Sequence, residues 1–224
     1  MSNSDARRHH HDHTTDSWAE RAKRYDDIID LLEPELQYAT EAMLDAVQVG
    51  SGTRLLDLAC GPGHSTAAAN ARGAEALGID SSPRMLEAAR RRFPDIQFKI
   101  ADMTNPPPGP WDAVICRLGA HHADDTWVNA AWRILVPGGR IALAEFDAID
   151  ETSRTKGMRH PSEWVRLLEG AGFVDVTVTT CILRLGSPAA STPNLVSTLR
   201  ENQNTHLQDG LVYILAGRKP TTRT

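Results

Sequence analysis

Two patterns of apolar residues divide the chain. From Ser17 to Val49, apolar side chains recur at steps of three and four residues, the period of a helix that buries one face. Pro34 interrupts this stretch, so we expect at least two helices within it. Residues 1–15 are polar and rich in histidine, and we expect them to be disordered. The pattern predicts a tail over residues 1–15 and a helical cap over residues 16–50.

From residue 51 onward, short apolar runs alternate with helical segments. The predicted strands are 54–59, 74–79, 96–101, 113–116 and 140–146, and the predicted helices are 65–72, 84–93, 127–135 and 162–171. This alternation is typical of βαβ units, which form a parallel sheet covered by helices on both faces. Two further runs, 173–185 and 211–217, have no strong helix between them, which favours an antiparallel pair at the sheet edge. Residues 51–224 therefore form one α/β domain, with the polar segment 186–210 as an insertion.

A glycine-rich turn follows the first predicted strand. The segment from Asp57 to Gly63 reads DLACGPG and leads directly into a helix. Glycine permits positive φ and close approach of the backbone to a ligand, and the start of a helix offers free N–H groups. A dinucleotide-binding fingerprint needs a third glycine where this chain has Thr66. The turn indicates a ligand site that departs from the dinucleotide pattern, and a tight turn without a ligand is the alternative.

Two acidic residues end the next two predicted strands. Asp80 lies seventeen residues after Gly63, where a carboxylate can accept both ribose hydroxyls of an adenosine. The alternative is a cap for the following helix, which a neighbouring serine can supply instead. Asp102 closes the third strand and is followed by Met103. This carboxylate is suited to an adenine amino group and the methionine to packing on the ring, while a turn aspartate is the alternative.

These segments together resemble the class I S-adenosylmethionine-dependent methyltransferases, and most closely the small-molecule branch that includes ubiquinone and menaquinone biosynthesis methyltransferases. Five segments match in the family's order, namely LLDLACGPG (55–63), GIDSSPRM (78–85), ADM (101–103), WDAVICRLGAHH (111–122) and AWRILVPGGRIALAE (131–145). The resemblance implies a Rossmann-like, seven-stranded and mostly parallel sheet whose last strand is antiparallel.

The resemblance also implies S-adenosylmethionine as the cofactor and assigns its contacts. Its methionine and ribose end would be lined by Asp57, Ala59, Gly61 and Gly63. Its ribose and adenine would be held by Asp80, Ser81, Met85, Asp102 and Met103, and it would be flanked by Arg117 and Leu118. Ala59 stands where many family members have glycine, so we expect a small steric effect there. Tyr25, on the first predicted helix, is either a lid over the cofactor or a core residue.

Two adjacent histidines are the candidates for acid–base chemistry. Methyl transfer from a sulfonium needs alignment and, for a hydroxyl or an acidic carbon, removal of a proton. His121 and His122 follow the fourth strand, at the carboxyl edge where open α/β sheets bind ligands, and histidine titrates near neutral pH. Either one is a candidate base. Local packing is the alternative, and it is stronger for His122.

Charge and composition limit the kinds of partner that we expect this protein to bind. A formal net charge of −5 argues against a nucleic-acid partner, and no stretch approaches the ~20 apolar residues of a membrane helix. Cys60, Cys116 and Cys181 lie far apart in apolar segments, as expected for reduced thiols in the cytoplasm. The histidines of the tail would bind metal only adventitiously, so we expect no specific metal site. The oligomeric state stays open.

The sequence therefore predicts a cytoplasmic S-adenosylmethionine-dependent methyltransferase that acts on oxygen or carbon of a small-molecule acceptor. One alternative is a protein that binds S-adenosylmethionine without transferring methyl, as a cyclase or a regulatory module would. A nicotinamide-dependent oxidoreductase is a further alternative, which the missing third glycine disfavours.

Overall fold

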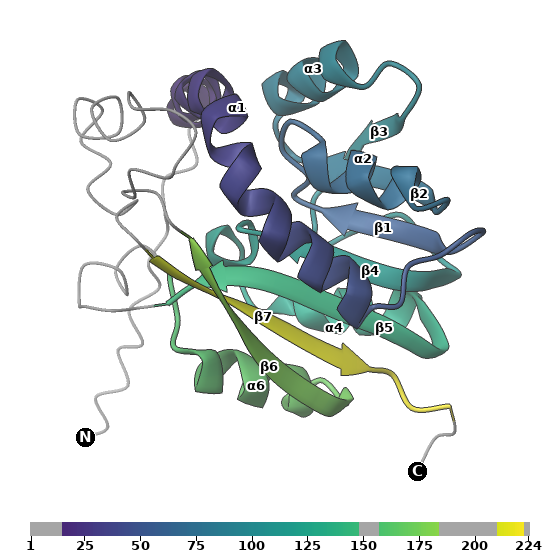
Figure 1. The fold of residues 1–224 in the computed structure, drawn as a ribbon. Helices are drawn as coiled ribbons and strands as arrows, with labels where there is room; N and C mark the ends of the chain where they lie inside the picture. Colours follow the sequence, from purple (N-terminus) through teal and green to yellow (C-terminus); the bar gives the residue numbers. More distant parts are fainter. Residues whose placement is uncertain (1–14, 148–156, 184–209, 222–224) are drawn as a thin grey trace, which may run out of the picture.

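Seven strands form one mixed sheet in the order β3-β2-β1-β4-β5-β7-β6 (Figure 1). The computed structural model describes residues 15–147, 157–183 and 210–221, with side chains described from residue 29 onward apart from Leu31, Leu183, Gly210 and Leu211. The strands are β1 Arg54–Leu58, β2 Glu75–Asp80, β3 Gln97–Ile100, β4 Trp111–Arg117, β5 Leu135–Phe146, β6 Val174–Leu183 and β7 Gly210–Arg218. The helices are α1 Thr15–Ala46, α2 His64–Ala71, α3 Pro83–Arg92, the 3-10 turn η1 Ala120–His122, α4 Thr126–Ile134 and α6 Pro161–Gly170.

The strand order places a ligand crevice at the centre of the sheet. β1 pairs in parallel with β2 on one side and with β4 on the other, so the chain reverses its winding direction between β1 and β4. Ligands of open α/β sheets bind beside the carboxyl ends of the strands at such a switch point. Asp57 and Arg117 lie near those ends of β1 and β4, and Asp80 ends β2.

The last strand is inserted between β5 and β6. β7 runs antiparallel to both neighbours, while the other described pairs are parallel. The expected seven-stranded, mostly parallel sheet with an antiparallel last strand is therefore confirmed. β5 is longer than predicted, because it begins at Leu135 and extends through the Pro-Gly-Gly turn that the sequence assigned to a connection.

Two hydrophobic cores lie on opposite faces of the sheet. One packs α1 and α2 against residues such as Leu55, Ile115 and Ile214. The other packs α4 and α6 against Leu56 and Leu143, with Trp127 and Trp164 among its largest buried side chains. The central parallel strands β1 and β4 are buried on both faces, which explains why they appear in the sequence as continuous apolar runs.

α1 continues through Pro34, so the predicted break into two helices is wrong. Proline removes a helical hydrogen bond at a cost of about 3 kcal/mol. Here its ring is exposed, while α1 buries Ile29 and Leu32 before it and Leu36 after it against the sheet. Burial of such side chains contributes about 1.5–3 kcal/mol each, so the packing on both sides of the proline offsets the lost bond. In the part of the chain that the structure describes, no helix combines the length and the apolar character needed to cross a membrane.

Candidate functional site

The turn between β1 and α2 has a left-handed backbone at three positions. Ala59, Gly61 and Gly63 have φ of 51, 53 and 91°. A Cβ at Gly61 would meet no atom within 4 Å, whereas a Cβ at Gly63 would lie 2.7 Å from the Phe98 ring of β3. Gly63 therefore permits close packing, while Gly61 leaves open space above the turn. Ala59 adopts a conformation that costs an L-residue about 1–2 kcal/mol and that glycine would adopt more readily.

Thr66 occupies the position of the missing third glycine without separating α2 from the sheet. The site of a Cβ on Gly78 of β2 would be 2.7 Å from the Thr66 hydroxyl oxygen. The glycine at this contact between α2 and the sheet is therefore Gly78 on the strand, and the side chain of Thr66 on the helix packs against it. The dinucleotide fingerprint fails here, yet the close packing of helix on sheet that its third glycine provides is kept.

Asp57 is a fully buried carboxylate with one unsatisfied oxygen. Its Oδ2 accepts hydrogen bonds of 2.7 Å from the hydroxyls of Ser65 and Thr66, while its Oδ1 is buried without a partner among the described residues. Burial raises the pKa of Asp57 to about 6, although the two hydroxyls and the charge of Arg117 act to lower it. An unpartnered buried acceptor costs about 1–3 kcal/mol, and a cationic or N–H ligand group would relieve that cost.

Asp80 ties the end of β2 to the glycine turn. Its Oδ2 accepts from the Gly61 N–H at 2.9 Å, and its Oδ1 accepts from the Ser82 N–H at 2.8 Å. Ser82, whose hydroxyl accepts from the Met85 N–H, caps α3, so Asp80 is not that cap. Burial raises the pKa of Asp80 against the effect of the two N–H groups. Each carboxylate oxygen retains a second lone pair for a ligand hydroxyl.

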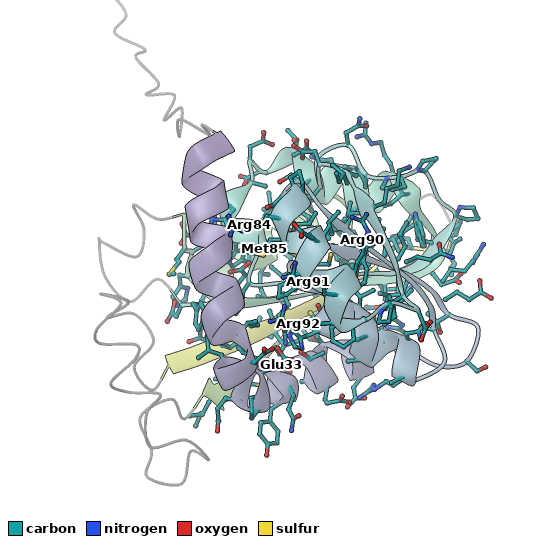
Figure 2. The ribbon with its side chains drawn as sticks, turned by 90° about the horizontal axis from the view of Figure 1, so that it is seen from above. Glu33, Arg84, Met85, Arg90, Arg91 and Arg92 are labelled. Atoms are coloured by element: carbon teal, nitrogen blue, oxygen red, sulfur yellow. The ribbon has the colours of Figure 1, made fainter. Side chains whose placement is uncertain are left out.

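The residues predicted to hold the ribose and adenine, apart from Asp80, lie in the segments that follow β2 and β3. Asp102 is exposed and its Oδ1 accepts from the backbone N–H and the hydroxyl of Thr104, both at 2.8 Å. Asp102 therefore stabilises a local turn, which was the alternative to adenine binding. Met103 is buried in the second core, and Ser81 is exposed. Figure 2 shows α1 passing beside α3, which carries the half-buried Met85.

Arg117 is directed toward α1. Its guanidinium donates to both carboxylate oxygens of Glu33, at 2.7 and 2.8 Å, and to the Thr40 hydroxyl at 2.7 Å. Its side chain is only 5% exposed. Leu118, the next residue, is partly buried and has a left-handed backbone with φ of 56°. The sequence placed Arg117 beside the cofactor but did not reveal that it connects the sheet to the cap helix.

His121 forms a buried ion pair with a residue that sequence reasoning missed. Its Nδ1 lies 2.8 Å from Oε2 of Glu145, the residue before the end of β5, and the second oxygen of Glu145 accepts from the Ala120 N–H at 2.7 Å. The two side chains are 9% and 2% exposed. His122 is exposed, and its ring centroid lies 3.9 Å from that of His121. The available signal was a lone glutamate in an otherwise apolar run, IALAEF, at the carboxyl end of a central strand.

Several predicted features lie outside the described residues. These are the tail over residues 1–14, the insertion over residues 186–209 and the side chain of Tyr25, whose backbone belongs to α1. Among the described residues, no group of three or more histidine, cysteine or acidic side chains is arranged to hold a metal ion. Cys60 and Cys116 are buried free thiols, and Cys181 is a half-buried one.

The seven-stranded sheet, with a glycine turn at its switch point and an acid at the end of each of the next two strands, is a Rossmann-like fold similar to that of class I methyltransferases. Residues 55–139 match the family model described as "Methyltransferase domain". The predicted resemblance to class I S-adenosylmethionine-dependent methyltransferases is confirmed.

Two similar proteins are named methyltransferases. A trans-aconitate 2-methyltransferase of Methylobacterium nodulans is 39% identical over 118 residues, which cover 50% of this chain and 45% of that protein. A demethylmenaquinone methyltransferase of Beutenbergia cavernae is 35% identical over 130 residues, which cover 56% of this chain and 54% of that protein. The matched segment thus spans about half the length of these curated relatives.

Solved structures share the fold at low identity. Phosphoethanolamine N-methyltransferase 2 of Haemonchus contortus, in complex with S-adenosyl-L-methionine, superposes with a TM-score of 0.71 at 18% identity, covering 92% of this chain and 60% of that one. The [4+2]-cyclase SpnF superposes with a TM-score of 0.66 at 17% identity, covering 90% and 96%. These likenesses concern the fold alone.

Proposed function

We propose that this chain is an S-adenosylmethionine-dependent methyltransferase that acts on oxygen or carbon of a small-molecule acceptor. The observation that carries the proposal is the unpartnered Oδ1 of buried Asp57 at the start of the glycine turn. The cofactor's methionine portion has a cationic amino group, which suits a buried carboxylate that lacks a partner. The names of the relatives and the family match support the same activity.

The other groups of the crevice fit the remaining parts of this cofactor. Gly61 leaves space above the turn, Asp80 has lone pairs for ribose hydroxyls, and Asp102 stands at the end of the next strand for the adenine. When bound, S-adenosylmethionine supplies an electrophilic methyl group on a sulfonium. The chain's own residues then align the acceptor, exclude water and, where the acceptor requires it, remove a proton through His121 or His122.

A protein that binds S-adenosylmethionine without transferring methyl is the second candidate. A [4+2]-cyclase shares this fold, so the fold is compatible with chemistry other than methyl transfer. A nicotinamide-dependent oxidoreductase is disfavoured, because Thr66 occupies the third glycine position and donates its hydroxyl to Asp57. We further propose a cytoplasmic location, which the free cysteines favour, and a partner set without nucleic acid, which the net charge of −5 favours.

Calorimetric titration separates these candidates. The purified chain is titrated with S-adenosylhomocysteine and, separately, with NAD. Binding of the first and not of the second supports the proposal, and release of S-adenosylhomocysteine on incubation with S-adenosylmethionine and an acceptor then distinguishes a methyltransferase from a binding protein. Binding of NAD alone, or of neither ligand, would overturn the proposal.

A further inference from the structure

We propose that Glu145 and His121 act as a proton-accepting pair for acceptors that lose a proton when they are methylated, that is phenols, enols and comparable O–H or C–H acids. His121 is the base, and Glu145 is the positioning residue that acts through it. This inference rests on the proposed methyltransferase function and names the acceptor class that the site serves.

The geometry fixes which ring nitrogen is available. Glu145 is held at both oxygens, one by the Ala120 N–H and the other by Nδ1 of His121. Because a carboxylate only accepts hydrogen bonds, Nδ1 of His121 carries the proton in that contact. When the ring is neutral, Nε2 therefore holds the free lone pair. The carboxylate thus sets both the orientation of the ring and its tautomer.

The position of His121 places it beside the glycine turn. A Cβ on Gly119 would lie 2.6 Å from Cβ of Ala59, so the residue that precedes η1 is in contact with the turn. His121 follows two residues later, within about 7 Å along the chain. On its other side, the backbone of Gly157 packs against the carbonyl oxygen of His121, which shields the segment. His121 therefore lies in the segment that joins the glycine turn, through Gly119, to the end of β5, through Glu145.

The charge of Glu145 opposes the effect of burial on the His121 ring. Burial acts to lower the pKa of His121, but the charge of Glu145 and the hydrogen bond to it together outweigh burial and raise this pKa. Other titratable groups near the pair include His122, whose ring is tilted by 47° to that of His121, Cys116, whose thiol is affected by the charge of Glu145, and Asp147, which accepts from the Tyr213 hydroxyl. Tyr213 pairs with Glu145 across β5 and β7.

The proton step defines the acceptor class. The O–H or C–H bond of the acceptor breaks, its proton moves to Nε2 of His121, and its electron pair stays on the acceptor. That pair would form the bond to the methyl carbon while the carbon–sulfur bond breaks, so that S-adenosylhomocysteine would be the leaving group. A carboxylate such as trans-aconitate is already ionised at neutral pH and has no such proton, and an ammonium group can lose its proton to solvent before its nitrogen lone pair attacks. The pair therefore serves phenols and carbon acids specifically.

The test combines nuclear magnetic resonance titration of the His121 ring with methyl-transfer assays. We compare the wild type with Glu145→Gln, with His121→Gln, and with Glu169→Gln as a control at an exposed position of α6. The acceptor probes are a hydroquinone, a 1,3-diketone, trans-aconitate and phosphoethanolamine. Binding of S-adenosylhomocysteine and the unfolding midpoint are measured for every variant, so that a folding defect or a loss of cofactor binding is recognised separately.

We expect neutral His121 to carry its proton on Nδ1, and we expect Glu145→Gln to lower the pKa of His121, because the substitution removes the charge that raises it. With hydroquinone or the diketone, Glu145→Gln and His121→Gln should each reduce kcat about 100-fold, with little change in KM or in S-adenosylhomocysteine binding. Glu169→Gln should match the wild type. An unchanged His121 titration in Glu145→Gln would overturn the inference. So would transfer confined to trans-aconitate or phosphoethanolamine, or no transfer to any probe despite cofactor binding. Failure of S-adenosylhomocysteine to bind the wild type would instead refute the proposed function.

Discussion

The guanidinium of Arg117, at the end of β4, donates to both carboxylate oxygens of Glu33, at the middle of α1, across distances of 2.7 and 2.8 Å. The two residues are 84 positions apart in the chain. The pair attaches the cap helix to the face of the sheet that contains Asp57, whose pKa also responds to the charge of Arg117. α1 is therefore held against the sheet by a specific, nearly buried ion pair as well as by apolar packing.

Removing one partner of this ion pair should destabilise the fold. Glu33→Gln removes the carboxylate that accepts from both terminal nitrogens of the 5% exposed Arg117 guanidinium, and we expect the free energy of unfolding to fall by about 3 kcal/mol. Urea denaturation measures this change. Glu35→Gln, two residues away on the same helix, is the matched control and should change the stability by less than about 0.5 kcal/mol. Equal effects of the two substitutions would show that the ion pair does not hold the cap.

The ionisation of Asp57 should make stability depend on pH. Because burial raises its pKa in the folded protein to about 6, the protonated form is favoured in the fold. This contribution is fully present below the unfolded-state pKa of about 4 and is lost as the pH rises through about 6. Between pH 4 and 7 the wild type should therefore lose about 3 kcal/mol relative to Asp57→Asn, which does not titrate. Chemical denaturation at a series of pH values tests this, and parallel curves for the two proteins would contradict it.

Asp80 should contribute both to the conformation of the glycine turn and to the affinity for the cofactor. Asp80→Ala removes the acceptor of the Gly61 N–H and the proposed ribose contacts, so S-adenosylhomocysteine should bind with a loss of about 2 kcal/mol, roughly thirtyfold. Calorimetric titration measures this loss. Asp95→Ala, at an exposed position after α3, is the control and should bind like the wild type. Unchanged affinity in Asp80→Ala would argue against ribose binding at this site.

The two glycines of the turn should respond differently to alanine. Gly63→Ala places a Cβ 2.7 Å from the Phe98 ring and should cost about 2–4 kcal/mol of stability through strain and overpacking. A second change, Phe98→Ala, removes that clash and should make Gly63→Ala less costly than it is in the wild-type background. The measurement is a double-mutant cycle by urea denaturation. Additive costs would show that the clash is not the cause.

Gly61→Ala meets no neighbouring atom, so its stability cost should be limited to the left-handed backbone, about 1 kcal/mol. Its methyl group would enter the open space above the turn, and we expect the affinity for S-adenosylhomocysteine to fall at least tenfold. Calorimetry and denaturation of the same preparation separate the two effects. A variant with reduced stability and unchanged affinity would place the ligand elsewhere.

The sequence by itself determined the fold class and the location of the crevice. Apolar periodicity is a local property, so the alternation of strands and helices could be predicted from it. The acids that end β2 and β3, and the glycine turn after β1, could be located because they stand at fixed offsets from those strands. Asp80 and Gly61 were correctly placed together at one sheet edge on this basis.

The tertiary structure alone decided which groups meet and which are left without a partner. The continuation of α1 through Pro34 depends on packing against strands far along the chain, which overrides the local preference of proline. The contact of Arg117 with Glu33, the unpartnered oxygen of Asp57 and the pairing of His121 with Glu145 likewise involve long-range contacts. Burial converts such contacts into large electrostatic effects because it removes the solvent that would screen them, and burial is known only once the chain is folded.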